Sequence, residues 1–174
     1  MNKKKLETYR KYKRELKRET YLDTKGDVTG RQILTRLRGG CAGLAVEMGR
    51  RSGEGAEGRI CQLCERAQEN ETHFMLDCPI LEEERTEWFT VHDELLTRAA
   101  REEKKIEIEM RERVKNGLER EPKKMRDRSR RQKIGLIFGE GIPESQQGRA
   151  TRATMSFARR AMAKRRSTLM KREK

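Results

Sequence analysis

Apolar residues recur at helical spacing in the first part of the chain. Between residues 2 and 22 they lie three to five positions apart, and Lys and Arg fill most of the other positions. Because an α-helix has about 3.6 residues per turn, this pattern predicts a basic amphipathic helix. Two glycines in the segment 23–30 predict its end.

A second, shorter helix is predicted from Gly30 through the segment RQILTRLRGG, and the two final glycines mark its end. Its apolar residues fall on one side of the helix: Ile33, Leu34 and Leu37. Residues 49–58 contain four glycines, so they are predicted to form a flexible loop.

The longest helical pattern covers residues 81–120, which are rich in Glu, Arg, Lys and Leu. Apolar residues recur there at three- or four-residue steps, and opposite charges lie four residues apart, so one long helix or two are predicted. The apolar positions form two groups: Trp88, Val91, Leu95 and Ala99, and then Ile106, Met110, Val114 and Leu118.

A basic linker is predicted at residues 122–133, followed by a short apolar patch and a turn containing Gly and Pro. The last helix is predicted at residues 150–171, with one apolar stripe formed by Met155, Ala158, Met162 and Leu169. These patterns together indicate a mostly α fold.

The composition limits how much apolar packing can contribute to this fold. Of the 174 residues, 33% are hydrophobic and 41% are charged. A typical globular domain has roughly 45–50% apolar residues, so a large self-sufficient core is not expected. A bound metal ion would supply part of the missing cohesion.

One segment, CQLCERAQENETHFMLDC, contains residues with metal-binding chemistry. Cys61, Cys64, His73 and Cys78 form a C-x2-C-x8-H-x4-C motif. Three thiolates and one imidazole are ligands that Zn²⁺ binds in tetrahedral geometry, and four protein ligands leave no open position on the metal. The expected fold is therefore mostly α, with helices around a small zinc-stapled loop region and with flexible basic termini.

The net charge is +14, the pI is about 10.0, and the charge is unevenly distributed. Residues 1–38 and 141–174 each carry +8, whereas residues 39–121 carry −7. Lys and Arg gain affinity for phosphate by releasing counterions, so nucleic acid is the expected partner. The predicted parts are a basic N-terminal helix and linker (1–30), a zinc-binding module (31–90), a charged helix (91–121), and a basic linker with the C-terminal helix (122–174).

The neighbours of the metal motif extend this interpretation. The sequence continues from ILTRLRGG through RICQLC to ETHFMLDCP, and then to Arg85 and Phe89. It resembles the zinc-binding region near the carboxyl terminus of reverse transcriptases of non-LTR retrotransposons. The resemblance covers about a third of the chain, although this chain has CQLC where that family prefers proline after the first cysteine.

The resemblance implies a zinc-stabilised module that binds RNA or single-stranded DNA and lies downstream of the catalytic parts of such an enzyme. The chain has no Tyr- or Phe-x-Asp-Asp polymerase segment, and its acidic residues lie in helical runs beside Lys and Arg. The sequence shows neither a nucleophile with a base nor a metal site with an open position. We therefore expect a non-enzymatic protein without a small-molecule substrate.

The candidate phosphate contacts lie in the short helix, the basic linker and the last helix: Arg36, Arg38, Lys123, Lys124, Arg130, Arg131, Arg159, Arg160, Lys164, Arg165 and Arg166. Binding through them would be mostly to the phosphate backbone and would weaken steeply with salt. Phe74 is the only aromatic residue inside the metal motif, where it either packs under the metal or faces solvent to stack on a base.

A second interpretation is a protein-interaction or assembly module with a purely structural zinc site. In this interpretation the charged helix associates with itself or with another helix through the stripe of Ile106, Met110, Val114 and Leu118. A decayed mobile-element fragment is a third interpretation.

Other features are assigned less specific roles. His92 has no cysteine near it, so a surface or helix-packed position is expected, and Cys41 is expected to be a small buried or surface thiol. No apolar stretch follows Met1, and no run reaches the roughly 20 apolar residues of a membrane span. We expect an intracellular protein, nuclear or cytoplasmic and not secreted, with no membrane partner.

Overall fold

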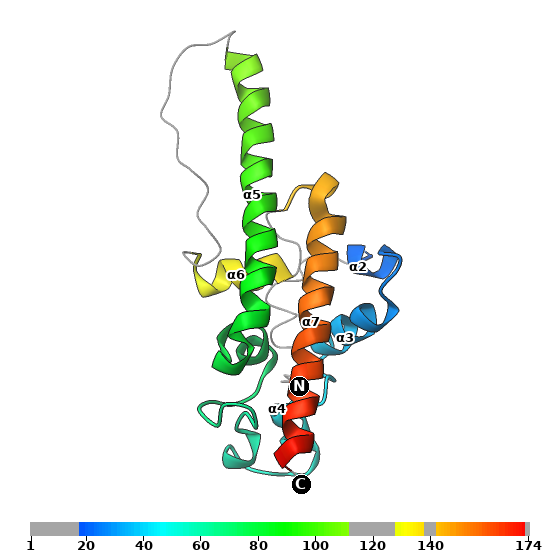
Figure 1. The fold of residues 1–174 in the computed structure, drawn as a ribbon, viewed down its shortest axis with the longest axis vertical. Coiled ribbons are helices and arrows are strands. Elements are labelled where there is room, and N and C mark those ends of the chain that lie inside the picture. The colour runs from blue at the N-terminus through cyan, green and yellow to red at the C-terminus, as the bar shows by residue number, and fades with distance from the viewer. Residues whose placement is uncertain (1–17, 112–127, 138–141, 173–174) are drawn as a thin grey trace, which may run out of the picture.

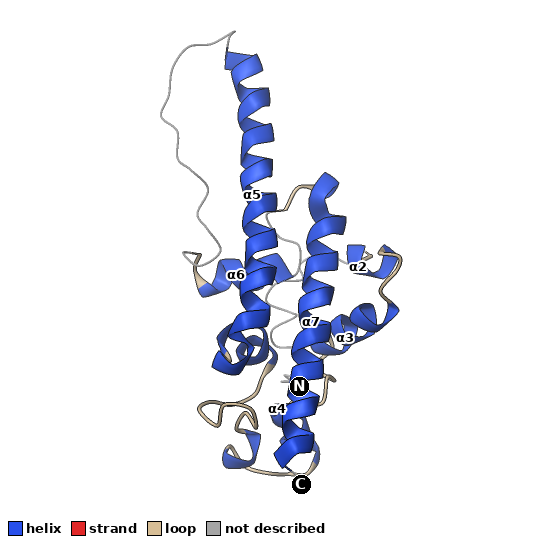
Figure 2. Ribbon diagram, viewed as in Figure 1, coloured by secondary structure: helices blue, strands red, loops and turns tan. Residues whose placement is uncertain are grey.

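The computed structural model describes residues 18–111, 128–137 and 142–172, and every regular element in these ranges is a helix (Figure 2). The mostly α fold expected from the sequence is confirmed. The α-helices are α2 (Thr20–Asp23), α3 (Val28–Arg38), α4 (Ala45–Arg51), α5 (Glu82–Arg111), α6 (Arg130–Ile137) and α7 (Glu144–Arg172). Short helical turns between α4 and α5 are η1 (Glu57–Arg59), η2 (His73–Asp77) and η3 (Pro79–Leu81).

Helices α5 and α7 run side by side in opposite directions and form the centre of the molecule (Figure 1). Trp88 of α5 stacks on Phe157 of α7 with 4.8 Å between the ring centroids, and its indole N–H donates a 3.0 Å hydrogen bond to Thr154. Such aromatic pairs contribute about 0.5–1.5 kcal/mol beyond the area they bury. One buried cluster joins both helices to α3 and to the loop that carries the cysteines.

Helix α3 packs across α7 through its glycine. The Asp27 side chain caps α3 by accepting a 2.7 Å hydrogen bond from the Gly30 N–H, so the helix begins at Val28 rather than at Gly30 as predicted. Gly30 lies so close to α7 that a Cβ there would be 2.9 Å from the Cβ of Met155. Leu34 and Met155 are both fully buried at this crossing.

Helix α4 was not predicted, and one of the contacts at its start comes from a residue distant in the sequence. Its first residue, Ala45, donates its backbone N–H to the Glu69 carboxylate at 2.7 Å. The side chain of Glu47 accepts hydrogen bonds from the loop just before the helix. The flexible loop predicted at 49–58 therefore overlaps the last residues of a helix, and it also contains the first residues of η1.

Other boundaries also differ from the predictions. Helix α6 begins inside the predicted linker, and α7 begins six residues before the predicted start, directly after Pro143, whose carbonyl accepts hydrogen bonds in its first turn. The predicted helix at 2–22 lies largely outside the described residues. Lys123 and Lys124 also lie outside the described residues, as do Val114 and Leu118 of the proposed association stripe. The other two stripe residues, Ile106 and Met110, lie on α5, where only the backbone is described. Among the helices that are described, none combines the length and the apolar character needed to cross a membrane.

Candidate metal centre

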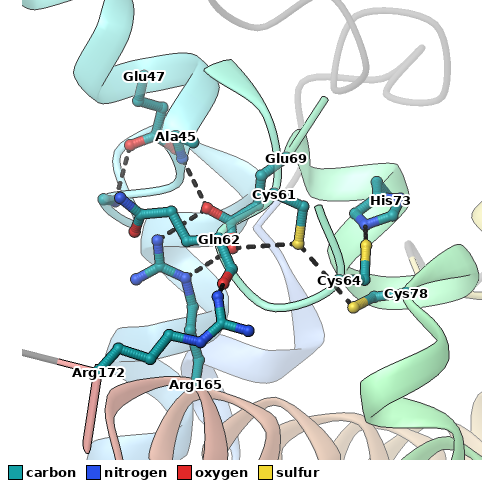
Figure 3. Close-up of polar contacts among 11 residues, drawn as sticks. Ala45, Glu47, Cys61, Gln62, Cys64, Glu69, His73, Cys78, Arg165 and Arg172 are labelled. Carbon is teal, nitrogen blue, oxygen red and sulfur yellow. Dashed lines mark hydrogen bonds and ion pairs between the residues drawn. The ribbon is translucent and has the colours of Figure 1, made fainter. Parts of the chain in front are cut away.

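The four predicted ligands come together at one end of the molecule. One ligand atom from each of Cys61, Cys64, His73 and Cys78 lies within 4.8 Å of all the others. The Cys61 and Cys78 sulfurs are 4.0 Å apart, and the Cys64 sulfur is 3.3 Å from Nε2 of His73 (Figure 3). Ligands around tetrahedral zinc are roughly 3.5–3.8 Å apart, given metal–ligand bonds of about 2.0–2.3 Å. The donor set and its spacing therefore fit such an ion.

The first two cysteines lie on a tight loop closed by backbone hydrogen bonds. The Cys61 N–H donates to the carbonyl of Ala67 at 2.7 Å, and Ile60 forms an isolated antiparallel bridge with Gln68. Within the loop, Glu65 adopts a left-handed conformation with φ of 57°, which turns the chain back after Cys64. Both sulfurs thus reach the same point from one short turn.

His73 is the first residue of η2, a single turn of π-helix, and Cys78 directly follows its last residue. Asn70 caps this turn, because its side-chain oxygen accepts a 2.8 Å hydrogen bond from the His73 N–H. The Cys78 N–H donates to the His73 carbonyl at 2.8 Å, five residues back, which is the π-helical pattern. This wider turn places both ligands at the metal centre, and the chain then continues through Pro79 into η3.

Arg85, near the start of α5, binds the backbone of the segment that carries the last ligand, Cys78. Its side chain is only 2% exposed, and it donates to the carbonyls of Met75 at 3.0 Å and Cys78 at 2.8 Å. Because a buried carbonyl without a partner is costly, this guanidinium fixes the backbone at the last ligand. A further ion pair joins it to Glu82.

Glu69 is fully buried behind the first cysteine and is neutralised by the last helix. Its carboxylate accepts two 2.7 Å hydrogen bonds from Arg165, and one oxygen lies 3.9 Å from the Cys61 sulfur (Figure 3). The hydrogen bonds to Glu69 raise the pKa of Arg165, so it stays charged.

The end of α7 also binds the loop that carries Cys61 and Cys64. Arg172 donates to the backbone carbonyls of Gln62 and Leu63 and pairs with the Glu65 carboxylate at 2.7 Å. Beside this contact lies an open pocket of about 390 Å³ between the loop and the end of the helix, partly lined by Ile60 and Leu169. The last helix therefore contacts the loop on both sides of Cys64.

The protonation states of the ligands suit metal binding. Burial lowers the pKa of His73, so its imidazole is neutral at pH 7. The hydrogen bond between Cys61 and Cys78 raises the pKa of Cys61 and lowers the pKa of Cys78, so Cys78 ionises first. A metal ion would bind all three cysteines as thiolates.

Two of the predicted phosphate contacts are instead largely buried in internal ion pairs. The side chain of Arg38 is 8% exposed, pairs with Glu19 at 2.9 Å and lies over the ring of Tyr21. The side chain of Arg165 is 12% exposed and binds Glu69. Little of either guanidinium remains accessible to a phosphate.

The other predicted phosphate contacts that the structure describes are exposed or partly exposed. Four pair with acidic side chains at 2.6 to 3.9 Å: Arg130, Arg159, Arg160 and Lys164. Three are exposed and have no acidic partner among the described residues: Arg36, Arg131 and Arg166.

Phe74 is 1% exposed and packs in the main core, so of the two roles considered for it the structure shows the packed one. His92 is also buried, against Trp88 on the same helix, as the helix-packed alternative predicted. Cys41 is an exposed free thiol and is not one of the four clustered residues.

Sequence reasoning missed the structural roles of Glu69 and Arg165, and it gave Arg85 a place in the pattern without a role. Arg85 had a local signal, since it follows the last ligand by seven residues at the start of a predicted helix. Glu69 and Arg165 had no such signal, because they are 96 residues apart and look like ordinary surface charges.

Comparison with known protein families, curated proteins and solved structures finds no match for this chain.

Proposed function

We propose that the chain binds one zinc ion through Cys61, Cys64, His73 and Cys78, and that this metal centre stabilises a non-enzymatic nucleic-acid-binding module. The observation that carries the proposal is the convergence of the four ligand atoms within 4.8 Å. Four protein ligands would complete a tetrahedral zinc site, so the metal has a structural role and no position for a substrate.

The nucleic-acid part of the proposal is supported by charge and by the resemblance described above. A net charge of +14 favours an acidic polymer, and RNA or single-stranded DNA is what the resemblance to the retrotransposon reverse transcriptases implies. We propose that the chain is related to the zinc-binding region of those enzymes. Thiolate ligands persist in a reducing compartment, so we place the protein inside the cell.

Metal analysis of the purified chain tests the metal centre. We expect about one zinc per chain, and we expect chelation to reduce the helical circular dichroism signal, because zinc binding supplies on the order of 10 kcal/mol to the folding of small zinc modules. Cys61→Ser and Cys78→Ser should lose the metal. Cys41→Ser is the matched control and should keep it; a chain that purifies without zinc and ignores the chelator would contradict the proposal.

Binding to a labelled single-stranded RNA tests the second part independently. We expect the affinity to fall steeply between about 50 and 200 mM salt, since each phosphate contact releases counterions. Affinity that does not change over this range would exclude a mechanism based on phosphate contacts, even in a chain that holds zinc.

A further inference from the structure

The solvent-facing side of α7 carries arginines at regular spacing. Arg152, Arg159 and Arg166 are all exposed and lie seven residues apart, which places them on the same side of the helix. With a rise of 1.5 Å per residue, successive arginines are about 10.5 Å apart along the axis. The positions between them on this side hold the small residues Ser156 and Ala163. We call the three arginines the α7 stripe.

Internal ion pairs separate this stripe from other basic residues of α7. Arg160 and Lys164 face α5 and pair with its acidic residues at 2.9 Å, and Arg165 and Arg172 bind the metal loop. Their charges are therefore already largely matched within the protein.

The stripe is much less neutralised. Arg152 and Arg166 have no acidic partner among the residues that the structure describes, and Arg159 approaches Asp27 only at 3.9 Å while its side chain stays 52% exposed. The helix itself adds no opposing charge, because its only acidic residue is Glu144 at the first position. The outer side of α7 therefore presents positive charge along about 21 Å.

We propose that a single-stranded nucleic acid lies along the α7 stripe, with its phosphates on Arg152, Arg159 and Arg166. This inference rests on the function proposed above and specifies its surface and its ligand. The opposite side of α7 is buried against α3 and α5, so only the outer side of the helix is available to the nucleic acid. Contacts limited to phosphates make the binding independent of sequence.

The straight course of α7 favours a single strand over a duplex (Figure 1). A duplex strand makes one turn in roughly 34–36 Å, so over about 21 Å it would wind more than halfway round the duplex axis and away from the helix. A single strand has no such constraint and can follow all three arginines.

Salt-dependent binding tests the stripe. Fluorescence anisotropy would measure the binding of a labelled 20-nucleotide oligouridine to the full chain and to Arg152→Gln/Arg159→Gln/Arg166→Gln, because Gln preserves helix propensity. Each phosphate contact to a single strand contributes about 0.7 to the steepness of log affinity against log salt. Losing three such contacts should therefore make this slope shallower by about 2. The corresponding triple Lys variant keeps the charge and should keep the slope. Circular dichroism checks that each variant is folded.

A control variant removes the same charge elsewhere: Lys25→Gln/Arg50→Gln/Arg51→Gln changes three exposed cations that lie off α7. It should change the slope by less than about 0.7. If the wild type binds the RNA but the slope of log affinity against log salt falls equally in the stripe and control variants, the α7 stripe is not the binding surface. The proposed function would then still stand. If the wild type binds no RNA, both fail. A wild type that prefers a 20-base-pair duplex or anionic phosphatidylserine vesicles over the oligouridine also overturns the inference.

Discussion

Arg165 binds Glu69 through two hydrogen bonds of 2.7 Å, and the Glu69 carboxylate is completely buried beside Cys61. The two residues are 96 positions apart, so the pair fastens the last helix to the loop of the metal centre. The same carboxylate accepts the backbone N–H of Ala45 at the start of α4. One side chain thus determines how α4, the loop and α7 meet.

Breaking this pair should strongly destabilise the fold. Arg165→Gln leaves a buried carboxylate without its cation, and removing one partner of a buried pair costs about 3–5 kcal/mol. Urea unfolding followed by circular dichroism measures the change in the free energy of unfolding. The control is Arg149→Gln, because Arg149 and Glu94 form a pair in which both side chains are more than half exposed, and such pairs contribute about 0–1 kcal/mol. Equal losses in the two variants would refute the structural role of the buried pair.

Replacing Arg85 by Lys should weaken metal binding. Lys keeps the charge but lacks the planar fork that reaches the carbonyls of both Met75 and Cys78, so the backbone at the last ligand would be less well fixed. Losing such a supporting contact typically lowers metal affinity 10- to 100-fold, which competition with a chromophoric chelator would measure. Arg101→Lys is exposed on the same helix and should leave the affinity unchanged. An unchanged affinity in Arg85→Lys would mean that the fork does not support the centre.

The local features of this fold could be predicted from the sequence. The spacing of apolar residues predicted α3, α5 and α7, since the 3.6-residue period holds wherever one side of a helix is buried. The ligand set was also readable, because thiol and imidazole groups at this spacing have few other uses. Their convergence in space agrees with that prediction.

Features that depend on distant residues could not be predicted. Helix α4 is capped by Glu69, which lies 24 residues beyond its first residue, and no local pattern indicates this contact. Arg165 and Arg166 are adjacent in a basic run, yet one is buried in an ion pair and the other is exposed. Only the position of each residue around the packed helix distinguishes them.

Gly30 and Gly148 should respond oppositely to alanine, although both lie in helices. Alanine gains about 1 kcal/mol of helix propensity over glycine, and at Gly148 the nearest atom to a new Cβ is 3.9 Å away, so Gly148→Ala should stabilise. At Gly30 a Cβ would be 2.5 Å from the capping Asp27 carboxylate and 2.9 Å from the Cβ of Met155. Overpacking costs about 1–3 kcal/mol, so Gly30→Ala should lower the thermal midpoint while Gly148→Ala raises it. A shift in the same direction for both would show that α3 does not pack this closely on α7.

His92 should make the stability depend on pH. Its Nδ1–H donates to the Trp88 carbonyl at 3.1 Å, and Nε2 is buried without a hydrogen-bond partner among the described residues. An added proton would have to enter this apolar site, and burial lowers the pKa of His92 from 6.5 to about 4. Between these values the unfolded chain binds more protons than the folded protein. The free energy of unfolding is therefore fully retained above about pH 6.5 and falls as the pH drops towards 4, by roughly 3 kcal/mol.

His92→Phe isolates this contribution, because phenylalanine fills a similar volume and cannot be protonated. Acid also protonates the metal ligands, but this affects wild type and variant alike, so the difference between their unfolding free energies reports on His92. Urea unfolding at several values between pH 7.5 and 4.5 should show the variant gaining stability relative to the wild type as the pH falls. Most of that relative gain should appear below about pH 6.5, where His92 of the unfolded wild type becomes charged. A difference that stays constant over the whole range would mean that His92 accepts its proton as readily in the folded protein as in the unfolded chain.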